Sequence, residues 1–496
     1  MDGDPKGCET MRNIRKQALA WLCVFMLCFP CTGALAEFSP RYEALSQGDG
    51  WTVSAAASVE SLSPLSRQSV QIVNDWLSHL KILISAGKVT QGEIQWDQDP
   101  LYAVSVQKQS GYTLTTFYPS AGAYLTEPQG RDALAILTDA DSWPDPALLP
   151  QTYAALAPGL YEKLAEYAAP KTVKEPTSIK NAARSASYEN YTLKADDLNA
   201  AWPALLEAIL PQIKTALKDQ PLWYARAEEL LRGLEFSGEC RFKRFLDKDG
   251  QDMGMQFTGN AAKGEDKRKV TLFGGYTPDK GGYLSLTLPA VKGKNNLKVT
   301  LAEKLTQKNG TNTLEAEGSY TRTMEGKTMS TTLNGTLKNV IKDEAEHWTG
   351  KITLTSTENK VKTTWVLSPD MSFTDEGLSG KVAVQKKEGS KVTAKGSLEL
   401  LVTPYQTLTA VSAASAKDLR GLAQERARTA LLSELSPLSG AVAQLASALP
   451  EKDRTRLLHD LRTDEWMNGP AVPVQQENAA QSADADDGWV VEEEQQ

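Results

Sequence analysis

The chain has 496 residues, a formal net charge of −8 and a pI near 5.3, and this acidic balance excludes the basic face of a nucleic-acid-binding protein. Hydrophobic residues make up 41% of the chain, which is enough to build a core of domain size. Four of the five cysteines lie before residue 37, so a chain without that stretch keeps Cys240 alone and can form no internal disulfide.

The first 36 residues have the pattern of a secretory signal peptide. The basic residues Arg12, Arg15 and Lys16 precede an apolar run over 18–31, and the small residues Ala34 and Ala36 stand where a signal peptidase cleaves. The run is shorter than the roughly 20 residues that span a bilayer. We therefore expect cleavage after Ala36, export to the extracellular space or cell envelope (the periplasm if the cell has an outer membrane), and no stable membrane span afterwards. The alternative is an uncleaved N-terminal anchor.

Residues 37–145 are predicted to hold a leading helix and the first antiparallel strands. Over 68–80, apolar residues recur at steps of three and four, which is the period of one helix face. Short segments rich in β-branched and aromatic residues follow, separated by turn-forming pairs. These predicted strands cover 92–96, 101–107, 112–118 and 123–126.

Residues 146–235 are predicted to form a helical insertion. An apolar stripe runs from Leu198 through Leu205 to Leu217, with Asn199 as a candidate N-cap, and Pro211 is expected to kink the helix or split it. The polar stretch 170–186 is expected to be an exposed loop, and 188–193 a single strand that returns to the sheet.

Residues 236–405 are predicted to form an antiparallel β meander. Apolar and polar residues alternate with a period of two, as at Leu284, Leu286 and Leu288, which is typical of sheets with one solvated face. Asp-Gly and Asn-Gly pairs supply the positive φ of tight hairpin turns. The leucines at 284, 286, 288, 398 and 400 would face either a packed core or a ligand pocket.

Residues 411–466 are predicted to form C-terminal helices, and 467–496 a disordered acidic tail. Within that tail, Trp489, Val490 and Val491 form an apolar triplet between acidic runs. Such a triplet could add to the sheet of a partner protein or dock in its groove. The alternative is an incidental apolar patch in an unstructured tail.

The sequence predicts no catalytic residues, no cofactor and no metal. The histidines His79, His347 and His459 are too far apart in sequence to form a known metal motif, and no nucleophile elbow or phosphate-binding loop occurs. The stretch that begins at Asp247 resembles the start of a calcium loop, but Thr258 stands where the twelfth-position glutamate belongs. We therefore interpret it as a β-turn. Cys240, near a predicted strand start, is expected to be a packed thiol.

The order of elements resembles the LolA-like half-barrel superfamily of exported lipoprotein and lipid carriers and sigma-factor regulators. The resemblance is one of architecture over about 65–402 and rests on no motif, so it assigns no functional residue. It implies an α+β fold with a large antiparallel β meander, as a half-barrel or curved sheet, and with inserted and C-terminal helices.

Three functions follow as hypotheses. The first is a non-enzymatic envelope or extracellular protein that binds a hydrophobic small molecule, a lipid or a lipidated partner on a curved sheet. The second is a structural or sensor module that binds another envelope protein without a ligand cavity. The third is a hydrolase with an unrecognised site.

Overall fold

The structure is a computed structural model of the whole chain. It describes residues 39, 41 and 50–461, with gaps at 88, 110–111, 127–147, 181–182, 217–223, 225–227, 230, 264–265, 278–280, 289–295, 325–326, 343–344, 359, 374–376, 409–414 and 423. The predicted cleavage residues Ala34 and Ala36 and the Trp489–Val491 triplet lie outside the described residues.

The fold is α+β and is dominated by one large, curved antiparallel sheet that does not close into a barrel, which confirms the predicted fold class. The sheet consists of two meanders. The first meander comprises β1 (Trp51–Leu62), β2 (Leu80–Ala86), β3 (Thr90–Trp96), β4 (Asp99–Gln109), β5 (Tyr112–Tyr118) and β6 (Ala123–Thr126).

The second meander is longer and follows the helical insertion. Its strands are β7 (Lys171–Val173), β8 (Ser187–Lys194), β9 (Glu235–Leu246), β10 (Asp252–Lys263), β11 (Asp266–Thr277), β12 (Gly281–Leu288), β13 (Asn296–Lys308), β14 (Thr311–Met324), β15 (Lys327–Lys342), β16 (Ala345–Glu358), β17 (Val361–Phe373), β18 (Leu378–Glu388) and β19 (Lys391–Pro404).

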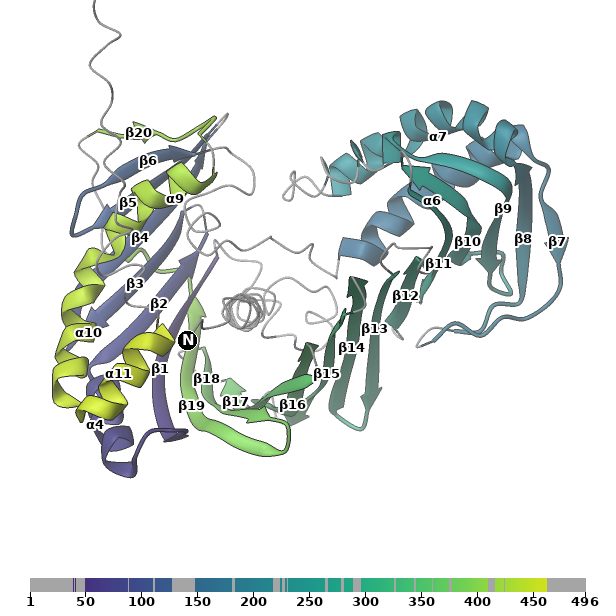
Figure 1. Cartoon of the computed structure of the whole chain (residues 1–496). Helices are drawn as coiled ribbons and strands as arrows, with labels where there is room; N and C mark the ends of the chain where they lie inside the picture. Colours follow the sequence, from purple (N-terminus) through teal and green to yellow (C-terminus); the bar gives the residue numbers. More distant parts are fainter. Residues whose placement is uncertain are drawn as a thin grey trace, which may run out of the picture.

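Pairing between the first and the last long strand joins the two meanders into one sheet. β1 runs antiparallel to β19, with Trp51 opposite Pro404 and Ala55 opposite Leu400. β1 also pairs with β2 on its other side, so it lies inside the sheet and not at an edge. The short β20 (Lys417–Asp418) adds to β6 in parallel. The resulting ribbon curves round so that its two ends form opposing arms (Figure 1).

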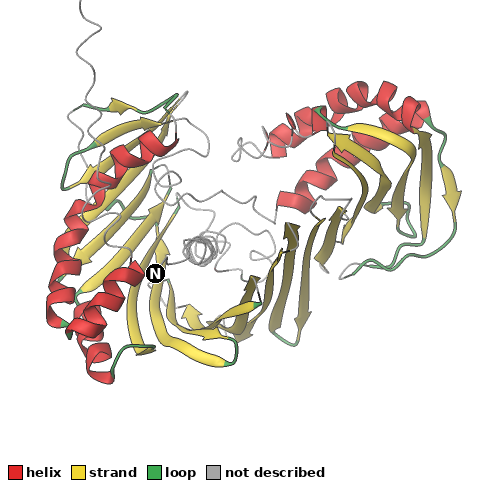
Figure 2. Cartoon of the chain, viewed as in Figure 1, coloured by secondary structure: helices red, strands yellow, loops and turns green. Residues whose placement is uncertain are grey.

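The helices lie at the two arms of the sheet (Figure 2). At one arm, α6 (Leu148–Tyr167) and α7 (Ala195–Ala216) pack on β8 and β9. At the other arm, a leading helix and the C-terminal helices gather on β1 to β5. These helices are α4 (Arg67–Ser78), α9 (Gln424–Leu432), the 3₁₀ turn η1 (Ser433–Leu435), α10 (Ser436–Ala448) and α11 (Glu451–Leu461).

Hydrogen bonds fix the start of α4 and hold it against α11. The Ser66 side chain caps α4 by accepting a hydrogen bond from the Ser69 backbone N–H at 3.1 Å. The Asp453 carboxylate of α11 accepts from the Ser69 hydroxyl at 2.6 Å and from the Ser66 backbone N–H at 3.2 Å. The bond from Ser69 is the main reason why the pKa of Asp453 lies below its usual value. Segments nearly 400 positions apart therefore form one unit.

One prediction about the helical insertion is wrong, and a second holds only in part. The α7 helix begins at Ala195, so Asn199 is not its N-cap. The Asn199 side chain instead donates to the Phe236 carbonyl at 2.9 Å and accepts from the Phe236 N–H at 2.8 Å, which ties α7 to β9. The expected exposed loop over 170–186 contains β7 and the buried Ile179, which packs on Phe245 against the sheet. The prediction missed Ile179 because most residues around it are polar.

The C-terminal region also differs at its start. The sequence predicts helices over 411–466, but Lys417–Asp418 is strand β20 and the first described helix there begins at Gln424. The first strand, β1, has no counterpart in the sequence prediction. Its small and polar residues have weak strand propensity, and its pairing with β2 and β19 overrides that propensity.

Candidate functional site

The strongest candidate for a functional surface is a continuous apolar face on the central strands, which we name the central apolar face. Its members alternate along each strand and lie opposite one another across strands, as Leu305, Leu314 and Leu337 do. The buried members are Leu305, Leu314, Leu337, Trp348, Ile352, Leu367, Met371, Leu378 and Val382, with Leu398, Leu400 and Val402 of β19 partly buried beside them.

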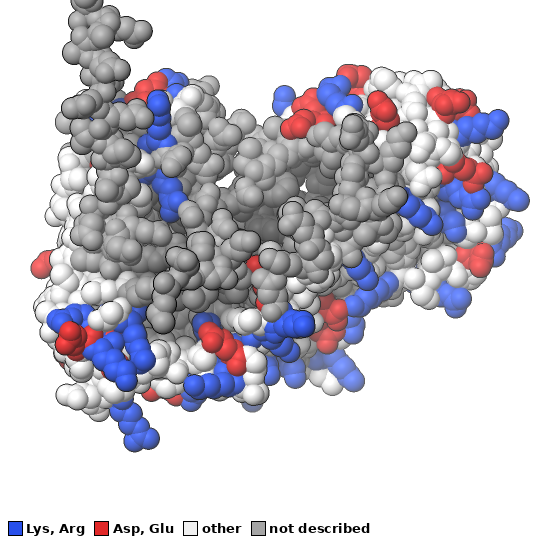
Figure 3. All heavy atoms as spheres, viewed as in Figure 1, with Lys and Arg blue, Asp and Glu red and all other residues white. Residues whose placement is uncertain are grey.

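The opposite face of the same strands is polar and rich in threonine and lysine. On β16, for example, Thr349, Lys351 and Thr353 alternate with Trp348 and Ile352 of the apolar face. Lysine and arginine side chains are mixed with acidic ones on the visible outer surface around the curve (Figure 3). This alternation gives the sheet one face suited to water and one suited to apolar groups.

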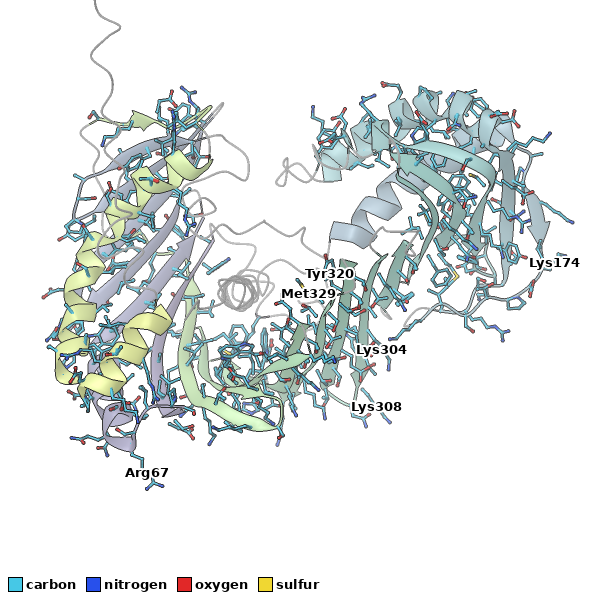
Figure 4. The ribbon with its side chains drawn as sticks, in the orientation of Figure 1. Arg67, Lys174, Lys304, Lys308, Tyr320 and Met329 are labelled. Carbon is cyan, nitrogen blue, oxygen red and sulfur yellow. The ribbon has the colours of Figure 1, made fainter. Side chains whose placement is uncertain are left out.

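Side-chain directions agree with this assignment of the two faces. In Figure 4, Tyr320 and Met329 point toward the side where the two arms face each other, whereas Lys304 and Lys308 point away from it. Tyr320 shares the strand parity of Leu314, and Met329 that of Leu337, so both belong to the apolar face. The apolar side of the central strands is therefore the inner side of the curve.

The described helices cover this face at its two ends. Followed through the strand register, the residues beneath α6 and α7, such as Phe242 and Phe257, lie on the same face as Leu305. The residues beneath α9, such as Tyr102 and Phe117, lie on that face at the other end. The substantial contacts of the described helices with the sheet are to β1, β2, β4, β8 and β9.

Of the five leucines predicted to face a core or a pocket, the structure describes the side chains of Leu398 and Leu400. Leu398 and Leu400 lie on the central apolar face and are partly buried. Leu284 lies opposite Leu301, and Leu286 opposite Val299, so the backbone places these strands in register with that face. The side chains of Leu284, Leu286 and Leu288 are outside the described residues.

A buried carboxylate, Glu346, interrupts the central apolar face at the start of β16. It is 3% exposed and accepts hydrogen bonds from the Asn339 amide at 2.8 Å and the Trp348 indole N–H at 3.5 Å. The backbone N–H of Arg41 donates to it at 3.0 Å, and the Ser39 hydroxyl donates to its other oxygen. Ser39 and Arg41, which come soon after the predicted cleavage site, therefore contact the middle of the sheet.

Sequence reasoning missed this group, although a signal for it exists. Glu346, Trp348 and Ile352 share one strand parity, so a charged residue stands in an apolar row. Asn339, which lies opposite Trp348, is a second polar residue on that face and is fully buried. A charge at a core-facing position is costly unless it is hydrogen-bonded, so it marks a specific environment.

A serine, a histidine and an aspartate meet on the polar face, where the hydrolase hypothesis can be assessed. His347 Nδ1 lies 2.7 Å from Ser372 Oγ, and its Nε2 lies 3.3 Å from Asp370. His347 and Asp370 are exposed, and their strands pair in register at these positions. A hydrolytic triad needs hydrogen-bond donors aimed at a developing oxyanion. Ser372 itself lies on paired strands, opposite His347 of β16 and Ser379 of β18.

The other histidines do not converge with His347. His79 contacts Asp97 at 2.6 Å and stacks on Trp96, and its hydrogen bond to the Asp97 carboxylate raises the pKa of His79. The side chain of His459 lies outside the described residues. An open hollow of about 640 Å³ on the polar face has a mixed lining, with the charged side chains of Lys81, Asp370, Lys381 and Glu399 beside Ala56 and Leu401.

Cys240 lies in the core under α7 and is fully buried, as expected for a packed thiol. Burial raises its pKa, so the reactive thiolate form is disfavoured.

The stretch that begins at Asp247 uses its first carboxylate to shape the turn itself. Asp247 Oδ1 accepts hydrogen bonds from the backbone N–H of Asp249 at 2.8 Å and of Gln251 at 2.7 Å. Gly250 has a φ of 79°, as a tight turn between β9 and β10 requires. Within the described ranges, no three His, Cys, Asp or Glu side chains gather closely enough to hold a metal ion.

We expect the protein to fold without a metal ion or a disulfide. Excess chelator and reductant should leave the melting temperature of the purified protein unchanged. Removing a ligand that binds only the native state lowers stability, so a metal site would be revealed by a lower melting temperature. A fall of several degrees with chelator, reversed by calcium and absent in an Asp247→Asn variant, would contradict this expectation.

Two further findings bear on function. In the part of the chain that the structure describes, no helix has the length and apolar character needed to cross a lipid bilayer. Comparison with protein-family models, with curated proteins and with solved structures found no match to this chain.

Proposed function

We propose that this is an exported, non-enzymatic protein of the cell envelope or extracellular space that binds a hydrophobic ligand on the central apolar face. The ligand would be an apolar small molecule, a lipid or the acyl chain of a lipidated partner. One observation carries the proposal. A continuous apolar face runs along the inner side of a curved sheet, while the described helices pack mainly at its two ends.

Elementary energetics and architecture support this reading. An apolar ligand that leaves water for an apolar face is stabilised by about 25 cal/mol for each Å² of its surface that becomes buried. A linear face suits a chain-like ligand, which can lie along successive strands. The likeness of architecture to the LolA-like carriers, which also present a curved sheet, agrees with a carrier role without assigning any residue.

A paired substitution tests the ligand face. Leu398 and Leu401 are on the same strand, but Leu398 lies on the central apolar face and Leu401 lines the hollow on the opposite face. Leu398→Ala should weaken binding of an apolar fluorophore such as N-phenyl-1-naphthylamine, and Leu401→Ala should not. If Leu398 is instead sealed in a packed core, its truncation should cost about 2–5 kcal/mol of stability without a change in binding.

Export can be tested separately by mass spectrometry of the secreted protein. We expect the mature chain to begin at Glu37, after the small residues at 34 and 36. Organic extraction of the same material should release a bound apolar compound. Retention of residues 19–31 in the secreted or membrane fraction would contradict cleavage and indicate an anchored protein.

A second candidate is a module that binds another envelope protein and has no ligand cavity. The observation that favours it is the full burial of Trp348 in the middle of the same face. Failure of apolar probes to bind, together with core-like behaviour of all the leucines on this face, would favour this reading over the carrier. The Trp489–Val491 triplet remains a proposed partner motif, tested by deleting residues 486–496.

A further inference from the structure

We propose that Glu346 and Asn339 form the polar end of the ligand site, and that this end selects amphiphiles with a hydrogen-bond-donating head group, such as a hydroxyl or an ammonium. Ser39 and Arg41 occupy the site in the unliganded protein. This inference rests on the proposed function, because it names the ligand class and the internal competitor for the same face.

The geometry supplies a recognition site of defined polarity. Both oxygens of the Glu346 carboxylate accept hydrogen bonds, and the donors come from different parts of the chain. Asn339 on β15 and Trp348 on β16 belong to the sheet and are fully buried. Ser39 and Arg41 come from outside the sheet and reach Glu346 across more than 300 positions.

The charge of this site determines which head group it accepts. A buried carboxylate is tolerated only when hydrogen bonds or an opposite charge compensate its lost hydration. In the described part of the chain, no lysine or arginine side chain lies within ion-pair distance of Glu346. Donors are therefore what the site requires, and a carboxylate or phosphate head group would place like charges together at low dielectric.

Ser39 and Arg41 donate to Glu346 the same kinds of hydrogen bond that a ligand head group would donate. Ser39 presents a hydroxyl and Arg41 a backbone N–H, which are the groups that an alcohol or amine head would bring. An amphiphile can place its head at Glu346 and its chain along Trp348 and Ile352 only if Ser39 and Arg41 give up their hydrogen bonds to Glu346. The ligand and these two residues therefore compete for Glu346.

Three probes with the same apolar chain test head-group selection at pH 7: dodecylamine, 1-dodecanol and dodecanoate, each below its aggregation concentration. The wild-type protein should bind the amine and the alcohol at least tenfold more tightly than the carboxylate. Glu346→Gln keeps the shape but removes the charge, so the amine-to-carboxylate ratio should fall below threefold. Glu399→Gln is the matched control because Glu399 is exposed and lines the hollow on the polar face, and it should leave the ratio unchanged.

A second variant keeps the proposal testable if Glu346→Gln does not fold. Ser39→Ala removes one donor of the internal competitor and changes no residue of the sheet, so it should raise the affinity for the amine and the alcohol by about fivefold, the equivalent of one hydrogen bond.

The possible failures can be told apart. Probe binding without head-group preference, or a preference that survives Glu346→Gln, would overturn this inference and leave the proposed function standing. Unchanged affinity in Ser39→Ala would overturn the competition. Absence of binding by all three probes would remove the proposed function itself.

Discussion

Replacing Gly380 by Ala is expected to lower the free energy of unfolding by about 3 kcal/mol, through a backbone conformation that L-residues avoid and a contact that cannot relax. Gly380 has a φ of +156°, and a Cβ at this position would lie 2.2 Å from the carbonyl oxygen of Asp370 and 2.6 Å from the Cα of Met371. Both are backbone atoms of the neighbouring strand β17, so the strand itself would have to move.

Gly389→Ala provides the matched control. Gly389 also has a positive φ, of +61°, but a Cβ there meets nothing within 4 Å. Its replacement should cost about 1 kcal/mol, which is the penalty of the left-handed conformation alone. Urea denaturation of both variants measures the difference. Equal destabilisation of the two would show that β17 and β18 are not as close as the structure has them.

The glycines of this region also explain why the sheet can curve. A Cβ on Gly350 of β16 would lie 2.3 Å from the Thr336 carbonyl oxygen, and one on Gly396 of β19 would lie 2.3 Å from that of Ser58. Pro369 of β17, opposite this stretch of β16, cannot donate to the sheet ladder. Loss of side chains and of a ladder bond at the bend favours a curved sheet over a flat one.

Local pattern was sufficient to predict the class of the fold and the faces of its strands. The alternation of Leu398 and Leu400 with polar residues needs only a period of two, and a register of hairpins then places them on one side. The α+β class and the antiparallel meander followed from the same periodicity and from the turn residues between the strands.

Long-range contacts could not be predicted from this pattern. Nothing in the weak strand signal of β1 indicates that Ala55 pairs with Leu400, because the pairing links positions about 350 apart. The hydrogen bond between Ser69 of α4 and Asp453 of α11 also joins distant parts of the chain and has no local signal. For the candidate site, the apolar rows were predictable, but the approach of Ser39 to Glu346 was not, since the two residues lie 307 positions apart.

The largest single packing contribution on the central apolar face is expected from Trp348. It is fully buried, its ring lies 6.1 Å from Phe373 in an edge-to-face arrangement, and its indole N–H donates to Glu346. Trp348→Ala should therefore lower the free energy of unfolding by about 3–5 kcal/mol through lost burial and a residual cavity. Denaturant unfolding followed by circular dichroism measures this loss.

Two further variants show how much of this loss comes from the indole hydrogen bond and how much from the depth at which the ring is buried. Trp348→Phe keeps most of the apolar volume but removes the N–H, so it should cost less than Trp348→Ala. Trp365→Ala, on the neighbouring strand β17, removes a partly exposed ring and should cost less again, because less apolar area is lost from burial. If Trp348→Ala were as mild as Trp365→Ala, the middle of the apolar face would be open and not packed. That outcome would favour a ligand site over β16, beside Glu346, and would support the carrier hypothesis over the protein-binding module.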